Sequence, residues 1–272
     1  MAELPELIIL ARQMNEALAG KSIAVVEVPQ PKCLNIPVDD FTAGLVGKSV
    51  VSVENRGKWL FLRLMPADYL LLNLGMGADL LYYAPGASLP DKYQLDVRLA
   101  DGSGFTARFW WFGYVHLVPE DKLGEHKLTA GTGLSPLEPA FTEEYLAGLL
   151  RGRKMAVKTI LMDQKNVAGI GNVYIQDTLF RARLHPLRPA NSLTPDEVRA
   201  LHQALRGVVE FSLSLNGAAY EKDFYGQKGG YGMEHLEVGY KEGQPCPACG
   251  TTIIKVKTGS TASYICPQCQ AL

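Results

Sequence analysis

Residues 246–269 read CPACGTTIIKVKTGSTASYICPQC, and they carry the clearest fold signal in the chain. Two Cys-x-x-Cys pairs, separated by 16 residues, can place four thiolates around a tetrahedral Zn²⁺ ion. Between them lie two β-rich runs, 252–257 and 261–265, joined by a Thr-Gly-Ser turn. This pattern predicts a zinc-ribbon-like hairpin. Since cysteine fills every ligand position, the one zinc is expected to be structural, held by Cys246, Cys249, Cys266 and Cys269.

A second signal lies upstream, where residues 169–174 read GIGNVY ahead of a candidate helix. Glycines before a helix let backbone N–H groups approach an anion closely. The motif is weak alone, because a tyrosine stands where the dinucleotide-binding fingerprint has its third glycine. Its basic surroundings favour a phosphate site, and the alternative is a tight turn between packed helices.

The charges of the chain are distributed unevenly. Residues 1–150 carry 12 basic and 18 acidic side chains, whereas residues 151–272 carry 15 basic and 10 acidic ones. Within 151–188 there are eight basic side chains against two acidic ones. If the chain binds a polyanion, its second half should make most of the contacts. The alternative is that the basic run is a solvated helix face.

The second half reads as mainly helical after a Gly-, Pro- and Thr-rich loop at 129–141. Thr194 and Glu197 form a capping box around Pro195, which predicts a helix to about residue 215, where Asn-Gly stops it. Residues 218–245 are rich in Gly and Tyr and are expected to form a loop. Three further candidate helices lie at 141–150, 155–164 and 173–182.

The first half reads as one helix followed by short strands. Pro5 suits the first turn of a helix, and the apolar residues after it approximate a stripe. No alternation of strands with helices follows, so a Rossmann architecture is not expected. We expect an α+β fold with an antiparallel β-sandwich and an N-terminal helix; the candidate strands are 22–28, 49–55, 58–64, 69–75, 93–100, 104–110 and 113–118.

Length and composition indicate a folded chain that acts in the cytoplasm. The 272 residues are 47% hydrophobic and 20% charged, which excludes wholesale disorder. No apolar run reaches the roughly 18 residues of a membrane span, and the first residues lack the basic start of a secretory signal. Disulfides are therefore not expected, which strengthens the metal interpretation of the cysteines. We expect a monomer that does not bind membranes.

Taken together, these segments resemble the formamidopyrimidine-DNA glycosylase / endonuclease VIII family over nearly the whole chain. The resemblance implies a β-sandwich domain at 1–130, a helix–two-turn–helix domain at 131–240 and a zinc finger at 241–272. It also implies that DNA is the partner and that oxidised bases are removed from it. The motifs that carry it are MAELPEL at the start, ENRGKWLFL at 54–62, NLGMGADLL at 73–81, LMDQKNVAGIGNVYIQDTLFRARLHP at 161–186, and the cysteine-rich tail.

The resemblance also implies a catalytic apparatus. In the family, the N-terminal α-amine freed by loss of the initiator methionine attacks C1′ of the damaged nucleotide and forms a Schiff base. An α-amine has a pKa near 8, so part of it is neutral and nucleophilic at physiological pH. Here Ala2 takes that position, Glu3 the acid/base position, Glu6 a supporting one and Lys58 the family's lysine position. The alternative is that both glutamates only favour a helix start and that Lys58 is a surface lysine.

By the same resemblance, Lys158 and Asn172 face phosphates, and Met76 and Phe112 fill the gap left by an extruded base. The chain departs from the family pattern in several places. Ala2 replaces proline, and Thr261 replaces a phosphate-gripping arginine of the zinc finger. The gap-filling arginine is replaced by Trp110 or Trp111, and the acid of the helix–two-turn–helix segment is shortened to Asp177.

Extruding a base from a duplex costs free energy, and enzymes offset this cost with side chains that wedge into the gap and with phosphate contacts. The departures remove part of this compensation. The tryptophans could instead stack on bases, or one of them could pack inside the sandwich, because neighbouring strand residues point oppositely. We expect a protein that binds damaged or abasic DNA with lost or reduced catalysis. The alternatives are an active glycosylase and abasic-site lyase using the Ala2 amine, a binder of structured RNA or single strands, and a structural or protein-interaction role.

Overall fold

The computed structural model describes residues 2–272, and Met1 lies outside them. The chain forms two compact units. The first contains residues up to Gly131 together with the later segment Asn216–Gly230, and the second contains Thr132–Leu215 and Tyr231–Leu272. The segment expected to form a loop, 218–245, is thus divided between the two units, because its first part belongs to the first unit and the part from Tyr231 to the second. Among the described residues, no helix is both long and apolar enough to cross a membrane.

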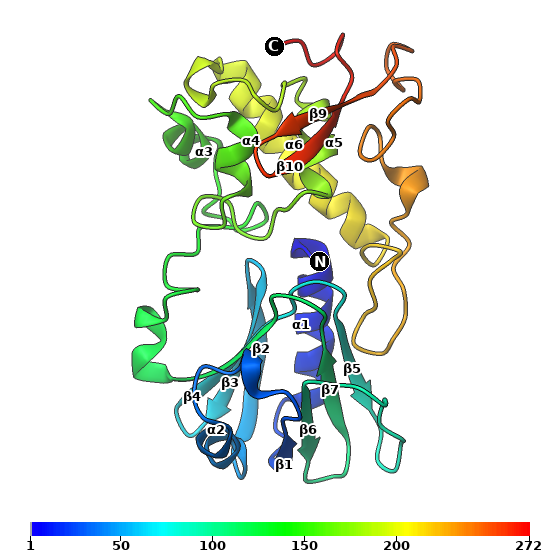
Figure 1. Cartoon of the computed structure of the whole chain (residues 1–272). Helices are drawn as coiled ribbons and strands as arrows, with labels where there is room; N and C mark the ends of the chain where they lie inside the picture. Colours follow the sequence, from blue (N-terminus) through cyan, green and yellow to red (C-terminus); the bar gives the residue numbers. More distant parts are fainter. Residues whose placement is uncertain (1) are drawn as a thin grey trace. The chain divides into compact units, whose positions relative to one another are not determined.

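The first unit begins with α1, Leu4–Leu18, as the sequence predicts (Figure 1). Glu3 is its N-cap and forms a capping box with Glu6, and Pro5 lies in the first turn. Its apolar stripe is buried, with Met14 and Leu18 fully inaccessible. The segment 216–230 joins the same unit through Phe224, whose N–H donates to Gln13 of α1 and whose carbonyl accepts from Tyr82 N of β5.

Two antiparallel four-stranded sheets form the predicted sandwich. One has the order β1-β6-β7-β5, and the other has the order β2-β3-β4-β8. The strands are β1 Ile23–Glu27, β2 Ser49–Arg56, β3 Trp59–Met65, β4 Asp68–Asn73, β5 Asp79–Tyr83, β6 Leu95–Leu99, β7 Gly104–Arg108 and β8 Tyr114–Pro119. The sequence did not predict β5, nor the short helix α2, Val38–Leu45, and β7 ends two residues earlier than expected.

The main core of this unit lies between the two sheets and α1. Strand β3 is buried on both faces, because Leu60, Leu62 and Leu64 enter this core while Trp59 and Phe61 belong to a second apolar cluster. That second cluster is closed by Leu123 of the short 3₁₀ helix η2, Glu120–Glu125. Burial on both faces explains why β3 begins with four consecutive apolar residues, 59–62, rather than with an alternating pattern.

The second unit is helical, as the sequence predicts. Its helices are α3 Glu143–Leu150, α4 Val157–Met162, α5 Tyr174–Arg181 and α6 Pro195–Ser214. Seven of the eight residues of α5 are buried, so this helix forms the centre of the unit. The zinc-ribbon hairpin consists of β9, Ile254–Thr258, and β10, Thr261–Ile265, and it packs on α5 through Phe180.

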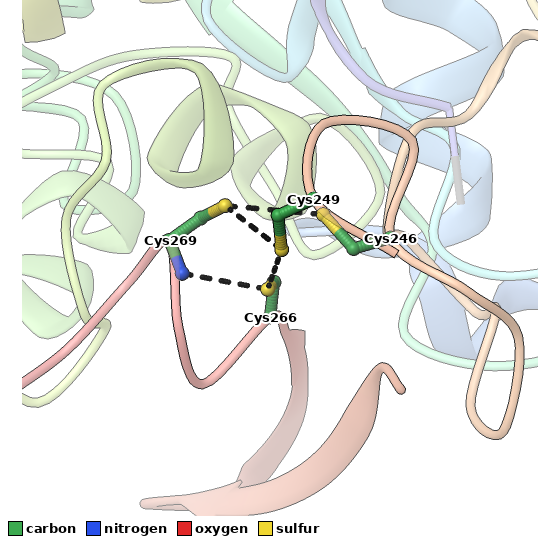
Figure 2. A group of neighbouring side chains, drawn as sticks. All are labelled: Cys246, Cys249, Cys266 and Cys269. Carbon is green, nitrogen blue, oxygen red and sulfur yellow. Dashed lines mark hydrogen bonds between the residues drawn. The ribbon is translucent and has the colours of Figure 1, made fainter. Parts of the chain in front are cut away.

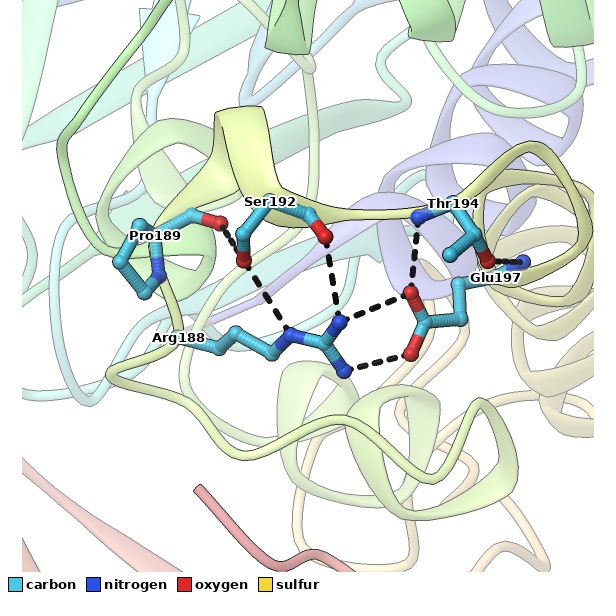
Figure 3. Close-up of polar contacts among 5 residues, drawn as sticks. All are labelled: Arg188, Pro189, Ser192, Thr194 and Glu197. Atoms are coloured by element: carbon cyan, nitrogen blue, oxygen red, sulfur yellow. Dashed lines mark hydrogen bonds and ion pairs between the residues drawn. The ribbon is translucent and has the colours of Figure 1, made fainter.

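The start of α6 shows how local signals fix an element (Figure 3). Thr194 N donates to Glu197 Oε2 at 2.8 Å, and Glu197 N donates to Thr194 Oγ1 at 3.3 Å, which is the predicted capping box. Arg188 forms a two-pronged ion pair with Glu197 and also donates to Ser192 Oγ at 3.2 Å. Burial acts to raise the pKa of Glu197, but the Thr194 N–H and the Arg188 guanidinium outweigh it and hold the pKa below its usual range.

Candidate functional site

The start of α1 brings Ala2, Glu3 and Glu6 together. Their exposed fractions are 5%, 3% and 6%, respectively. Glu6 Oε2 accepts from Glu3 N at 2.9 Å, and Glu6 Oε1 accepts from Ala218 N at 3.0 Å. Glu6 therefore fixes the backbone beside Ala2. The interpretation of both glutamates as helix-start residues is correct, and their chemical role stays a prediction.

Lys58 lies in the turn between β2 and β3. Its carbonyl accepts from Asn73 Nδ2 at 2.9 Å, which ties the turn to the end of β4. Asn15 near the end of α1 accepts from Val53 N at 2.9 Å, and Gly20, just after the helix, donates to Val50 O at 2.8 Å, so α1 runs antiparallel to β2. The N-terminus of α1 therefore points toward the Lys58 turn (Figure 1).

Met76, Trp110, Trp111 and Phe112 lie in two loops at that end of the sandwich. Their exposed fractions are 47%, 67%, 64% and 71%. Packing of either tryptophan inside the sandwich, the alternative considered above, is therefore wrong. Strand β7 ends at Arg108, before the tryptophans, so they belong to the connection between β7 and β8. What these side chains bind stays a prediction.

In the second unit, Lys158, Asn172 and Thr261 meet at one point, although they come from three separate segments. Lys158 Nζ donates to Asn172 Oδ1 at 2.9 Å and to Thr261 Oγ1 at 3.0 Å. It also lies 2.9 Å from Ala262 O. The three residues expected to face phosphates thus form one cluster. The lysine is only 2% exposed, and its ammonium points into the hairpin rather than out to solvent.

Sequence reasoning missed two hydroxyls that complete this environment. Thr258 Oγ1 and Ser263 Oγ lie 3.1 Å and 2.9 Å from Lys158 Nζ. Thr258 is paired with Thr261 at the hairpin turn, and Ser263 lies two residues beyond Thr261 on the same face of β10. That alternation of hydroxyl residues was the available signal. All five acceptors are neutral, so burial lowers the pKa of Lys158 to about 8.

The glycine-rich turn ahead of α5 is also held by side chains. Gly169 has a φ of +87° and its N–H donates to Gln164 Oε1 at 2.8 Å. Gln176 Nε2 donates to Asn172 Oδ1 at 3.0 Å, so Asn172 is oriented from two sides. Asp177 does not face this turn, because its carboxylate accepts from the backbone N–H groups of residues 237–239 at 2.8–3.0 Å. Asp177, the shortened acid, therefore holds the loop at residues 237–239 in place.

The four predicted zinc ligands come together (Figure 2). Their sulfur atoms all lie within 4.8 Å of one another. Three of the sulfur pairs are separated by 3.4 Å, 3.5 Å and 3.9 Å. A tetrahedral ion with Zn–S bonds of about 2.3 Å requires sulfur separations of about 3.8 Å. The donor set therefore fits one Zn²⁺ ion, with no ligand position left for water or substrate.

The surroundings of the cysteines suit thiolates that share a cation. The N–H groups of Ala248 and Cys269 each donate to a cysteine sulfur at 3.4 Å. Hydrogen bonds from Thr251 lower the pKa of Cys249 to about 6. Burial, by contrast, raises the pKa of Cys269 to about 12, so an ion is needed to ionise all four. The zinc is structural and joins the two ends of the β9–β10 hairpin.

Comparison with protein families gives three matches along the chain. Residues 1–110 match the formamidopyrimidine-DNA glycosylase N-terminal domain. Residues 132–223 match the formamidopyrimidine-DNA glycosylase H2TH domain. Residues 243–272 match the zinc finger found in FPG and IleRS.

Individual relatives agree with these matches. The formamidopyrimidine-DNA glycosylase of Roseiflexus sp. (strain RS-1) is 39% identical over 99% of this chain and 100% of its own length. That of Pelotomaculum thermopropionicum is 37% identical over 99% of each chain. The Lactococcus lactis formamidopyrimidine-DNA glycosylase, solved non-covalently bound to DNA containing an abasic site, superposes with a TM-score of 0.90 at 26% identity over 100% of both chains. The MutM (FPG) protein of Thermus thermophilus gives a TM-score of 0.87 at 29% identity over 98% of both chains.

Proposed function

Because the chain belongs to the formamidopyrimidine-DNA glycosylase family, we propose that it binds damaged or abasic DNA and that its excision chemistry is lost or much reduced. The observation that carries this proposal is the alanine at position 2, where the family has the proline whose amine is the nucleophile. The start of α1 next to that position keeps the Glu3–Glu6 capping box, and the second unit keeps the four zinc ligands.

The substitution at position 2 acts on the nucleophile itself. A proline ring fixes the direction of its secondary amine, whereas the primary amine of Ala2 rotates about its N–Cα bond. A misdirected nucleophile loses much of the rate enhancement that positioning supplies. We therefore expect the substitution to lower the reactivity of the amine.

DNA binding is supported by the second unit. Residues 151–188 carry an excess of basic side chains, and Lys158 and Asn172 lie beside the zinc hairpin. Loss of arginine at Thr261 weakens this contact relative to the family pattern, because threonine carries no charge for a phosphate. We therefore expect the chain to bind through the same unit as its relatives, with fewer charged contacts.

Active catalysis is the second candidate function, and the buried carboxylates favour it. Glu3 follows Ala2 directly and is 3% exposed, and Glu6 orients its backbone at 2.9 Å. A carboxylate held beside an amine can take or give the protons of Schiff-base chemistry. In this case the chain is a glycosylase and abasic-site lyase that uses the Ala2 amine once Met1 is removed. Removal of Met1 falls outside the described residues.

The test is borohydride trapping on a duplex with one abasic site. A free N-terminal amine adds to the C1′ aldehyde, water leaves, and borohydride reduces the resulting imine to a stable amine linkage. We expect little adduct from the wild type despite binding, and more adduct from Ala2→Pro. Ala2→Ser is the matched control, because it keeps a small primary amine and should stay as unreactive as the wild type.

Intact mass of each protein identifies the residue at its N-terminus, so retention of Met1 is read separately from loss of chemistry. Rapid trapping by the wild type would overturn reduced catalysis and establish the enzyme. Absence of both adduct and DNA binding would leave a structural role for the fold. Binding to structured RNA instead of DNA would establish the other alternative. We further propose that the chain acts as a monomer in the cytoplasm.

A further inference from the structure

Three consecutive aromatic side chains stand exposed between β7 and β8, and a methionine from the β4–β5 loop lies beside them. We call Met76, Trp110, Trp111 and Phe112 the aromatic patch. Each of the three rings is more than 60% exposed, and Met76 is 47% exposed. Single exposed apolar residues are ordinary, but adjacent ones mark a surface that contacts something else.

The two loops of the aromatic patch are joined through their backbones. Met76 N donates to Trp111 O at 2.9 Å, and Trp110 N donates to Met76 O at 2.9 Å. Glycines permit this close approach. A Cβ at Gly75 would lie 2.1 Å from Trp111 O, and one at Gly77 would lie 2.8 Å from the ring of Trp110. The backbone that carries both tryptophans is therefore fixed by these contacts within the protein.

The residues on either side of the three aromatic side chains are fixed to the sandwich. Phe109 is buried, and its backbone N–H and carbonyl exchange hydrogen bonds with the side chain of Gln94, both at 3.0 Å. Gly113 lies against the Phe109 ring, where an added Cβ would be 2.2 Å away. Phe112 itself has a φ of +58°, which is uncommon for a residue with a side chain. A surface ordered in this way loses little conformational entropy on binding.

The chemistry of the patch suits stacking and does not suit base reading. The side chains that read a base edge by paired hydrogen bonds are arginine, lysine, asparagine, glutamine and carboxylates. The patch contains none of them, and its only polar side-chain groups are the two indole N–H donors. Every nucleobase presents a flat face to an aromatic ring, so stacking tolerates any base.

The place of the patch in the first unit favours nucleobases as the groups that bind to it. The register places Asn73 opposite Tyr114 and Asp79 opposite Arg108, so both patch loops leave the end of the sandwich that carries the Lys58 turn. That end also receives the start of α1. The patch is therefore continuous with the face at which the proposed function places the damaged nucleotide.

We propose that the aromatic patch is a stacking platform for unpaired nucleobases and that it accepts any base. The inference rests on the proposed function, because both place DNA at this end of the first unit. It adds that the base opposite a lesion is held by its face alone. The chain should therefore not discriminate among the four bases opposite an abasic site, and it should also bind single strands.

The test measures binding by fluorescence anisotropy for two kinds of labelled DNA at one salt concentration. The first is a duplex with an abasic site opposite A, C, G or T in turn, and the second is a single strand of oligo-dT or oligo-dA. We expect affinities within about twofold across the four duplexes and measurable binding of both single strands. The duplexes test binding to an unpaired base within a double helix, and the single strands test binding to bases outside one.

The variant is Trp110→Ala/Trp111→Ala, and its control is Tyr225→Ala, which removes a half-exposed ring elsewhere in the first unit. Because one stacked base strengthens binding roughly five- to 150-fold, the double variant should bind abasic duplex at least about tenfold more weakly. The control should bind like the wild type. Melting temperatures of all three proteins separate lost binding from lost folding.

Tryptophan emission gives a second measurement. The chain has three tryptophans, and Trp59 is buried, so acrylamide quenching reports mainly on the patch. DNA should protect the emission from quenching. Tenfold discrimination among the four opposing bases, or unchanged binding by the double variant, would overturn the platform. Protection of the tryptophan emission that grows with protein concentration in the absence of DNA would indicate self-association and would also overturn it. Failure to bind any DNA would overturn the proposed function as well.

Discussion

Lys158 carries a positive charge into a site where all of its hydrogen-bond acceptors are neutral. Its Nζ lies 2.9–3.1 Å from oxygens of Asn172, Thr258, Thr261, Ala262 and Ser263. An ammonium has three donors, so these acceptors share them. The lysine therefore joins the α4 segment to the zinc hairpin through uncharged acceptors alone.

Lys158 should give the protein a distinct dependence of stability on pH. Its pKa is about 8 in the folded chain, whereas lysine in an unfolded chain titrates near 10.4. Between these values the unfolded chain binds more protons than the folded chain, so the free energy of unfolding should rise with pH. Urea unfolding of the wild type and Lys158→Met from pH 7.5 to 10 measures this. Equal slopes for the two proteins would show that Lys158 titrates normally.

At the scale of elements, the sequence predicted those whose signals are local. Helix α6 begins where Thr194, Pro195 and Glu197 indicate, because capping and first-turn preferences involve only neighbouring residues. Strand β5 and helix α2 were missed. Each is short, and each depends on distant partners, β7 for the strand and the sandwich core for Phe41 and Leu45 of the helix.

The cap of α6 can be tested directly. Thr194→Ala removes the hydroxyl that accepts from Glu197 N at 3.3 Å, and such a loss costs about 1 kcal/mol. We expect the free energy of unfolding to fall by about that amount, as measured by urea titration followed by circular dichroism. Thr194→Ser is the control and should behave like the wild type. A Thr194→Ala protein of unchanged stability would mean that the Arg188–Glu197 ion pair alone fixes this helix start.

The zinc hairpin is the element on which binding should depend most. We expect one zinc per chain, and Cys249→Ser should lower zinc content and nucleic-acid binding while the β-sandwich stays folded. Cys33→Ser is the matched control, because that cysteine is buried in the core of the first unit and should retain both zinc and binding. Metal analysis, anisotropy and circular dichroism report the three properties. Unaltered DNA binding by Cys249→Ser would remove the hairpin from the interface.

For the whole molecule, the sequence was sufficient for the architecture and the metal site but not for the direction of side chains. Cysteine spacing alone identified four ligands that the fold does bring together. The alternating hydroxyls of the hairpin are visible in the sequence, but their contact with Lys158 is not, because Thr258 lies 100 residues away from it. The pattern of apolar residues in the strands also could not predict that both tryptophans are exposed, because their exposure depends on a loop that forms an isolated β-bridge with Met76.

The central claim is that this chain selects damaged DNA through a retained fold, whatever remains of its chemistry. Fluorescence anisotropy with a duplex containing one abasic site, and with the intact duplex of the same sequence, tests this most directly. Both titrations are made at the same salt concentration, because the phosphate contribution to binding depends on salt. We predict that the abasic duplex is bound at least about tenfold more tightly, which corresponds to about 1.4 kcal/mol. Equal affinity for the two duplexes, or binding to neither, would contradict the account.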